Sequence, residues 1–180
     1  MKLQASATIR PKFGVAMLLS AFLGIYASAP AQSAEADQTP ELEFLFEELV
    51  TLGPDEPVGA TPYGDRNIIP ITGGRFEGPK MKGEIVPGGW DWQLAASGGC
   101  KRLEADYMIK TDDGVVINVL NIGTFCTPPD GGPAHIFTTP VFEAPMGKYD
   151  WLNGGAYVGT VARAEVNGER AVRIRFYRAK

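Results

Sequence analysis

The residues of this chain best suited to chemistry surround one acidic side chain, Asp91, which lies between Trp90 and Trp92. Successive side chains of a β-strand alternate between its two faces, so the two indoles share one face and Asp91 occupies the other. If the indole face lines a cavity, it offers a stacking surface for an aromatic ligand. If Asp91 faces a dry cavity instead, its pKa rises and it can serve as a general acid or base. The purely structural interpretation, which we favour on general grounds, places both tryptophans in the core and has the carboxylate of Asp91 hydrogen-bond to a neighbouring turn.

Other polar residues extend the set of candidates for a ligand site. The guanidinium group of Arg66 could clamp a ligand carboxylate through two parallel hydrogen bonds, although a pair with Glu77 is more often a structural ion pair at a barrel end. Tyr107 is a further candidate acid or base, and Asn153 could place an amide in a pocket or cap the next turn. The predicted ligand-binding candidates are Arg66, Glu77, Trp90, Asp91, Trp92, Tyr107 and Asn153.

The sequence argues against several classes of active site. His135 is the sole histidine, so a zinc site with several histidines is excluded. The glycine pairs do not form a phosphate-binding loop, and there is no G-x-S-x-G nucleophile elbow. We therefore expect no metal and no cofactor, and the site would depend on proton transfer or on binding alone.

The first 36 residues resemble an export signal followed by the start of a linker. Lys2, Arg10 and Lys12 precede an apolar stretch over residues 13–26, and small residues follow. This is the pattern of a secretory signal peptide, with cleavage after Ala31 or Ala36. The apolar stretch is short for a membrane span of roughly 20 residues, so we expect no stable membrane insertion after cleavage. The predicted location is periplasmic or secreted.

The mature chain is predicted to be one acidic domain. Removing residues 1–31 takes away three basic residues and changes the net charge from −4 to −7, which disfavours nucleic acid as a partner. Residues 37–40 continue a polar linker, and residues 41–180 form a single domain. The oligomeric state stays open.

Most of this domain shows the alternation of β-strands. Period-two patterns cover residues 103–110 and 172–177, and glycine-rich turns separate further β-rich runs. Residues 41–52 are ambiguous, because Thr39 and Pro40 suit a helix start while Leu42, Phe44 and Phe46 alternate as in a strand. Many short strands without a long helical pattern predict an all-β protein, an antiparallel barrel or sandwich.

The turn at residues 111–115 fixes the register of one hairpin. Its sequence Thr-Asp-Asp-Gly-Val fits a three-residue loop with glycine in the left-handed region. In that register Tyr107 faces Val119, and Cys100 faces Cys126, the only other cysteine. An exported protein meets an oxidising compartment, so we predict a structural disulfide between these two residues.

Five blocks of sequence, in order, resemble the bacterial family of domains of unknown function numbered 3237, also called UPF 0311. The blocks are I-I-P-I-T-G-G-R-F-E-G-P, G-E-I-V-P-G-G-W-D-W-Q-L, T-D-D-G-V-V-I-N-V, F-T-T-P-V-F-E and Y-D-W-L-N, within residues 41–178. The resemblance implies an antiparallel β-barrel of the calycin or lipocalin-like kind, and it favours the strand for residues 41–52. The family offers no agreed catalytic residues. This chain departs from it at Trp90, where a small residue is usual, and at Asp106, where arginine is frequent.

Three functions remain open from the sequence. The first is a barrel that binds a small apolar or aromatic molecule, and we favour it. The second is a cofactor-independent isomerase, cyclase or lyase that uses the same cavity. The third is a structural or interaction module without a ligand.

Overall fold

The computed structural model describes residues 39–95, 98–128, 130–132 and 135–180, which belong to one compact unit. The predicted signal peptide and most of the polar linker lie outside the described residues. The elements are β1 (Leu42–Leu52), β2 (Glu56–Thr61), β3 (Gly64–Glu77), β4 (Lys82–Ala95), β5 (Cys100–Thr111), β6 (Val116–Cys126), β7 (Ile136–Glu143), the 3-10 turn η1 (Asp150–Leu152), β8 (Tyr157–Val166) and β9 (Glu169–Ala179).

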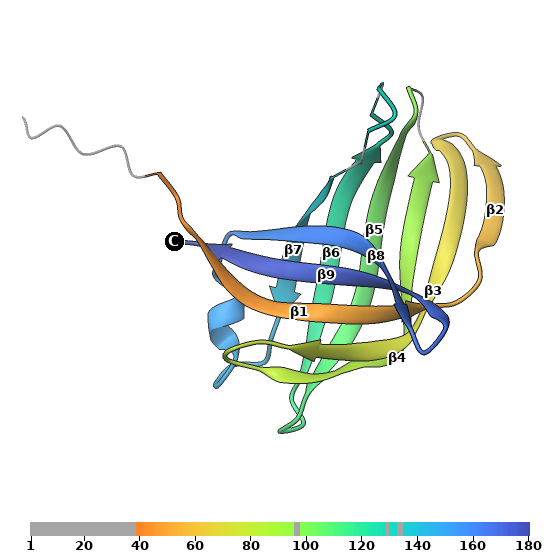
Figure 1. The fold of residues 1–180 in the computed structure, drawn as a ribbon. Helices are drawn as coiled ribbons and strands as arrows, with labels where there is room; N and C mark the ends of the chain where they lie inside the picture. The colour runs from red at the N-terminus through yellow and green to blue at the C-terminus, as the bar shows by residue number, and fades with distance from the viewer. Residues whose placement is uncertain (1–38, 96–97, 129, 133–134) are drawn as a thin grey trace, which may run out of the picture. The chain divides into compact units, whose positions relative to one another are not determined.

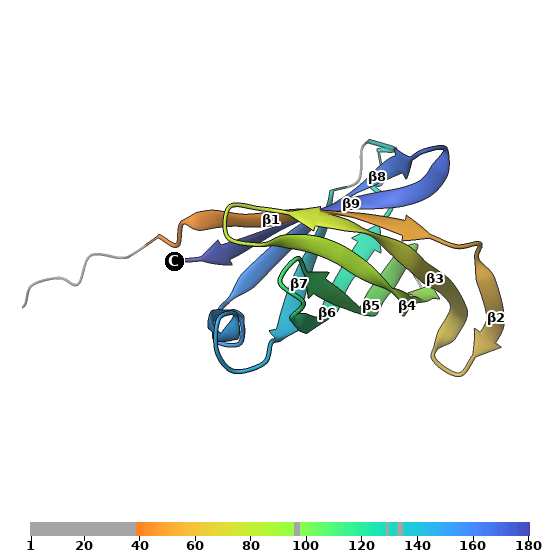
Figure 2. The ribbon, with the colours of Figure 1, turned by 90° about the horizontal axis from the view of Figure 1, so that it is seen from below.

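Eight of these strands close into an antiparallel barrel. The order of neighbours is β1-β9-β8-β7-β6-β5-β4-β3, and β1 also pairs with β3, which completes the ring. Strand β2 pairs with β3 alone and lies at the edge of the fold (Figures 1 and 2). The prediction of an all-β antiparallel barrel is confirmed, and residues 41–52 contribute a strand rather than a helix.

Strands β3 and β4 bend at their glycine pairs. The bend allows β3 to pair with β2 along its first half and with β1 along its second half. The register between β3 and β4 shifts between Ile71 and Arg75, next to Gly73 and Gly74. Beyond this bend, β3 pairs with β1 instead of β2, and Figure 1 shows its second half lying beside β1. Gly74 has φ of 135°, and a Cβ atom there would collide with the backbone of Leu49. Closure of the barrel therefore requires glycine at this position.

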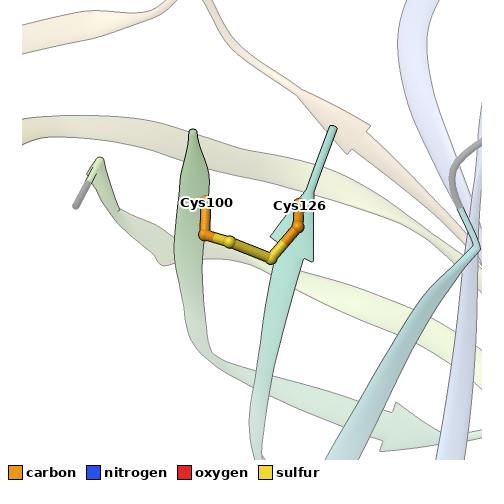
Figure 3. The surroundings of a disulfide bond; sticks show 2 residues. All are labelled: Cys100 and Cys126. Carbon is orange, nitrogen blue, oxygen red and sulfur yellow. A yellow bond between two sulfur atoms is a disulfide. The ribbon is translucent and has the colours of Figure 1, made fainter. Parts of the chain in front are cut away.

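The hairpin of β5 and β6 has the predicted register. Gly114 has φ of 90°, and the N–H of Thr111 donates to the carbonyl of Val115 at 2.9 Å across the turn. At the open end Cys100 faces Cys126, with 4.1 Å between their Cα atoms, and the two form a disulfide (Figure 3). The predicted pairing of the cysteines is confirmed.

An aromatic cluster fills one end of the barrel. Phe46 packs against Phe76, Phe142 and Phe176 with ring centroids 5.2 to 5.9 Å apart, and Tyr157 contacts Phe142 edge to face. Phe46 and Phe176 are completely buried. Burial of each such ring stabilises the fold by roughly 2 to 3 kcal/mol. Among the described residues, no helix has the length and apolar character needed to cross a membrane.

Candidate functional site

The end of the barrel opposite the aromatic cluster holds a cavity of about 510 Å³. On β1, for example, Phe46 belongs to the cluster, while Val50 and Leu52 line the cavity. A volume of this size is in the range of small-molecule sites. Most of the wall is apolar, with the aliphatic side chains of Ile69, Ile71, Leu103, Val161, Val172 and Ile174.

Asp91 is one of two acidic residues on the wall of the cavity, and the other, Asp55, lies at its open end. Its Oδ2 atom accepts a hydrogen bond of 2.7 Å from Nε2 of Gln93, whose Oε1 accepts one of 3.0 Å from Nζ of Lys101. Its Oδ1 atom is buried and has no hydrogen-bond partner among the described residues. Burial raises the pKa of Asp91 above its ordinary value, while the hydrogen bond from Gln93, the nearby backbone N–H of Glu104 and the charges of Lys101 and Arg170 oppose this rise. A fraction of protonated carboxyl group therefore persists to higher pH than in water.

The two tryptophans beside Asp91 lie on the outside of the barrel. Trp90 is 38% exposed and Trp92 is 41% exposed, and neither lines the cavity. The interpretation that buries both indoles in the core is therefore wrong. The strand alternates as expected, but its small and polar face, with Gly89, Asp91 and Gln93, is the inner one. The inner face can be polar here because it borders a cavity rather than packed core.

Beneath the cavity, a second carboxyl group is paired with Tyr107. The hydroxyl group of Tyr107, which lines the cavity, donates a hydrogen bond of 2.5 Å to Oε2 of Glu48. Glu48 is 0% exposed, and burial raises its pKa to about 8 against the weaker, opposite effect of this hydrogen bond. Burial likewise holds the pKa of Tyr107 well above its ordinary value, so its hydroxyl stays protonated. A Cβ atom at Gly89 would collide with the Cβ atom of Tyr107 and with the carbonyl of Asp106, so glycine allows β4 to approach β5 closely here.

Glu48 was not among the residues singled out from the sequence, although a signal was present. Glu48 lies two residues after Phe46 in β1, and side chains two residues apart share one face of a strand. The alternation that places Phe46 inside therefore places Glu48 inside as well. Two further buried polar residues of the cavity wall, Asn121 and Thr138, were missed as well. Both lie in sequence segments rich in β-forming residues, and nothing in those segments marks a polar residue as part of a site.

The structure brings Asp91 and Tyr107 of the seven candidates to the cavity and places the other five elsewhere. Arg66 and Glu77 lie at opposite ends of β3 and do not form an ion pair with each other. Asn153 uses its amide to clamp a loop, because Nδ2 donates to the carbonyl of Ala144 at 2.9 Å and Oδ1 accepts from its N–H at 2.8 Å. Ligand roles for Arg66, Glu77, Trp90, Trp92 and Asn153 at this cavity are not supported by its lining, and they stay predictions; Trp90 and Trp92 border a separate hollow beside Gly88 and Gly89.

Charged side chains border the open end of the cavity, which we call the mouth. Asp55 and Arg170 form an ion pair of 2.7 Å there, with both side chains about half exposed. Arg163 and Lys101 also line the cavity at this end. Within the described ranges, no group of three His, Cys, Asp or Glu side chains could hold a metal ion.

The family model that matches residues 40–179 is described as "Protein of unknown function (DUF3237)". A UPF0311 protein of Rhodopseudomonas palustris is 34% identical over 139 residues, which cover 69% of this chain and 91% of the relative. A UPF0311 protein of Clostridium acetobutylicum is 30% identical over 153 residues, with 76% and 94% covered. These matches confirm the resemblance inferred from the five sequence blocks.

Solved structures give the same result for the fold. A protein of Acinetobacter baumannii described as beta-barrel like has a TM-score of 0.72 at 32% identity, with 79% of this chain and 98% of that chain covered. An enzyme of Penicillium herquei has a TM-score of 0.61 at 26% identity, with 79% and 96% covered. A relative from the same organism, named a hydroalkoxylation enzyme, is 30% identical over 121 residues, with 67% and 74% covered.

Proposed function

Since this chain belongs to the DUF3237 family of proteins of unknown function, we propose its activity from the chemistry of the cavity itself. The barrel binds a small, largely apolar molecule and catalyses a cyclisation or isomerisation of it by proton transfer. The observation that carries this proposal is the position of Asp91, a carboxyl group with raised pKa on the wall of an apolar cavity. The name of the hydroalkoxylation enzyme supports the same class of reaction, the addition of an O–H group across a C=C bond.

The proposed step balances without an oxidant or reductant. The protonated carboxyl group of Asp91 gives its proton to one alkene carbon, and the substrate hydroxyl oxygen forms a C–O bond with the other carbon. The hydroxyl proton then returns to the carboxylate. The product is an isomer of the substrate, and Asp91 ends protonated, ready for the next turnover. A raised pKa favours the acid form that starts this cycle.

Binding without catalysis is the second candidate function, and it uses the same cavity. The apolar wall and the volume of the cavity support binding and catalysis equally. The two functions differ only in whether the carboxyl group of Asp91 transfers a proton to the bound molecule. The disulfide supports a further part of the proposal, namely that the protein works outside the cytoplasm, where disulfides persist. Fractionation of the host cells, with detection by antibody, tests this location. Recovery of the protein in the cytoplasmic fraction alone would contradict it.

The experiment that tests catalysis uses 2-prenylphenol, the simplest substrate with a phenol and a trisubstituted alkene at ring-forming distance. We expect conversion to the isomeric 2,2-dimethylchroman, detected by chromatography, and one carbon-bound deuterium per product when the solvent is deuterium oxide. Asp91→Asn should abolish turnover. Asp106→Asn, on the outer face of β5, is the matched control and should keep it. Binding of the phenol without turnover in any variant would leave the binding function and reject the catalytic one.

A further inference from the structure

Three polar side chains of the cavity wall hold buried atoms whose hydrogen-bonding capacity is unused. Within the described part of the chain, Oδ1 of Asp91, Oδ1 of Asn121 and Oγ1 of Thr138 are buried without a partner. Asn121 is 3% exposed and Thr138 is 5% exposed. A buried polar group without a partner destabilises a fold, so three beside one cavity need an explanation.

The strand register shows how these groups are arranged. Asp91 pairs with Ala105 on the next strand, and Ala105 pairs with Asn121 on the strand after that. The Cα atoms of Asp91 and Asn121 are therefore about 10 Å apart, on either side of a residue with only a methyl side chain. Along β5 the inner neighbours of Ala105 are Leu103 and Tyr107, both of which are much larger. Ala105 thus leaves a gap in the wall between a carboxyl group and an amide.

Thr138 lies beside this part of the wall, but its hydroxyl group faces away from Asn121. Thr138 pairs with Gly123 on β6 and with Gly159 on β8. A Cβ atom at Gly123 would meet the methyl group of Thr138, whereas a Cβ atom at Gly159 would collide with its hydroxyl oxygen. The polar side of the gap is therefore formed by Asn121 alone.

We propose that the gap over Ala105 is a subsite for a ring system that carries hydroxyl groups on two sides. One hydroxyl is bound by the amide of Asn121, and the opposite side of the ring faces Asp91. A hydroxyl group suits this site because it can donate to Oδ1 of Asn121 and accept from Nδ2 at once. This inference rests on the proposed function in that it names the substrate class of the same cavity.

The subsite also gives the proposed chemistry an orientation. A ring fixed through one hydroxyl at Asn121 presents its far side to Asp91 in a single register. Fixed geometry of this kind lowers the activation barrier of a reaction, because the entropy of bringing the reacting groups together has already been lost on binding. On the other side of the gap, the hydrogen bonds from Lys101 to Gln93 and from Gln93 to Asp91 fix the position of the carboxyl group.

The experiment compares the binding of 2,6-dihydroxynaphthalene, 2-naphthol and naphthalene to the full protein by titration calorimetry. We expect the diol to bind about tenfold more tightly than 2-naphthol, and 2-naphthol more tightly than naphthalene. Asn121→Leu, which keeps the volume and removes the amide, should abolish the advantage of the diol. Asn118→Leu, on the outer face of the same strand, should leave all three affinities unchanged.

Two further variants sharpen the test, and the second keeps it possible if Asn121→Leu fails to fold. Thr138→Val removes a hydroxyl group that faces β8 and should leave the preference for the diol unchanged. Ala105→Leu fills the gap and should weaken all three compounds. Equal affinities of the diol and 2-naphthol for the natural protein would overturn the subsite, as would an unchanged preference in Asn121→Leu or unchanged affinities in Ala105→Leu.

The subsite and the catalytic proposal can fail separately. A diol preference that depends on Asn121, without turnover of 2-prenylphenol, keeps the subsite and rejects catalysis. Turnover that depends on Asp91, with no effect of Asn121→Leu on the preference for the diol, rejects the subsite and keeps catalysis.

Discussion

The hydroxyl group of Tyr107 donates a hydrogen bond of 2.5 Å to Oε2 of Glu48, a residue 59 positions earlier in the chain. This contact joins β1 to β5 through the interior of the barrel. It lies between the aromatic cluster and the cavity, so it separates the packed part of the protein from the open part. The other oxygen of Glu48 is buried without a partner among the described residues, which favours the neutral acid.

Glu48 should make the stability of the protein depend on pH. Between its ordinary pKa of 4.5 and its folded value of about 8, the folded chain keeps a proton that the unfolded chain has lost. The free energy of unfolding therefore falls as the pH rises through this window, by on the order of 3 to 5 kcal/mol for this group. Glu48→Gln should remove most of this decline, measured by urea unfolding at pH 5 and pH 8.

The control for this prediction is Glu143→Gln, which changes an exposed carboxylate at the end of β7. It should leave the pH dependence as it is. An identical decline in Glu48→Gln and the natural protein would show that Glu48 ionises normally in the folded state.

Asp91 should show a conflict between function and stability. Because burial raises its pKa, the charged form is less favourable in the folded chain than in the unfolded one. Asp91→Asn should therefore raise the melting temperature at pH 7 and raise it less at pH 4, where the natural carboxyl group holds its proton more often. The same variant should lose turnover. Thermal unfolding at both pH values, beside Asp106→Asn, measures this effect, and a lower melting temperature at pH 7 would count against the raised pKa.

The disulfide should contribute measurably to stability. Cys100 and Cys126 enclose a loop with a sequence separation of 26 residues. In the chain-entropy model, such a loop stabilises the folded state by about 3.5 kcal/mol. The double variant Cys100→Ser with Cys126→Ser should unfold at correspondingly lower urea concentration. Addition of a reducing agent should lower the midpoint of the natural protein and leave that of the double variant unchanged. Equal stability of the two oxidised proteins would refute the estimate.

Asn153 should matter for folding and not for the ligand. Asn153→Ala removes both hydrogen bonds to Ala144 and leaves that buried backbone without its partners, at a cost of about 1 to 3 kcal/mol. The affinity for 2-naphthol, measured by calorimetry, should stay unchanged, because this loop does not line the cavity. Asn118→Ala serves as the control for stability. Weaker binding of 2-naphthol by a folded Asn153→Ala variant would instead support the ligand role predicted from the sequence.

The register of one hairpin could be predicted from the sequence because a local turn determines it. The loop at residues 111–115 admits few conformations, and pairing then follows residue by residue as far as Cys100 and Cys126. No comparable local signal exists for the closure of β1 on β3, which depends on a glycine bend in a strand distant in sequence. The resemblance to the family implied a barrel and a strand at residues 41–52, but not which strands close the ring.

The candidate site could be predicted only in part, because alternation separates two faces without saying which one is inside. Hydrophobicity favours Trp90 and Trp92 as the inner residues, and this preference holds where the interior is packed. In this barrel the interior at that level is a cavity, so Asp91 can face inward and the indoles can remain outside. Glu48 was overlooked for the same reason, since a carboxylate in a strand is expected to face water.

Glu41 and Lys180 meet, because β1 lies between β3 and β9 and the N–H of Lys180 donates to the carbonyl of Glu41. The first strand is therefore held on one side by the last one. During synthesis β1 emerges long before its partner β9, so the ring can close only after translation has delivered the final strand. Until then both β1 and β8 expose an unpaired edge, and such edges promote association between chains. Loss of the last ten residues would fix the protein permanently in that open, aggregation-prone state.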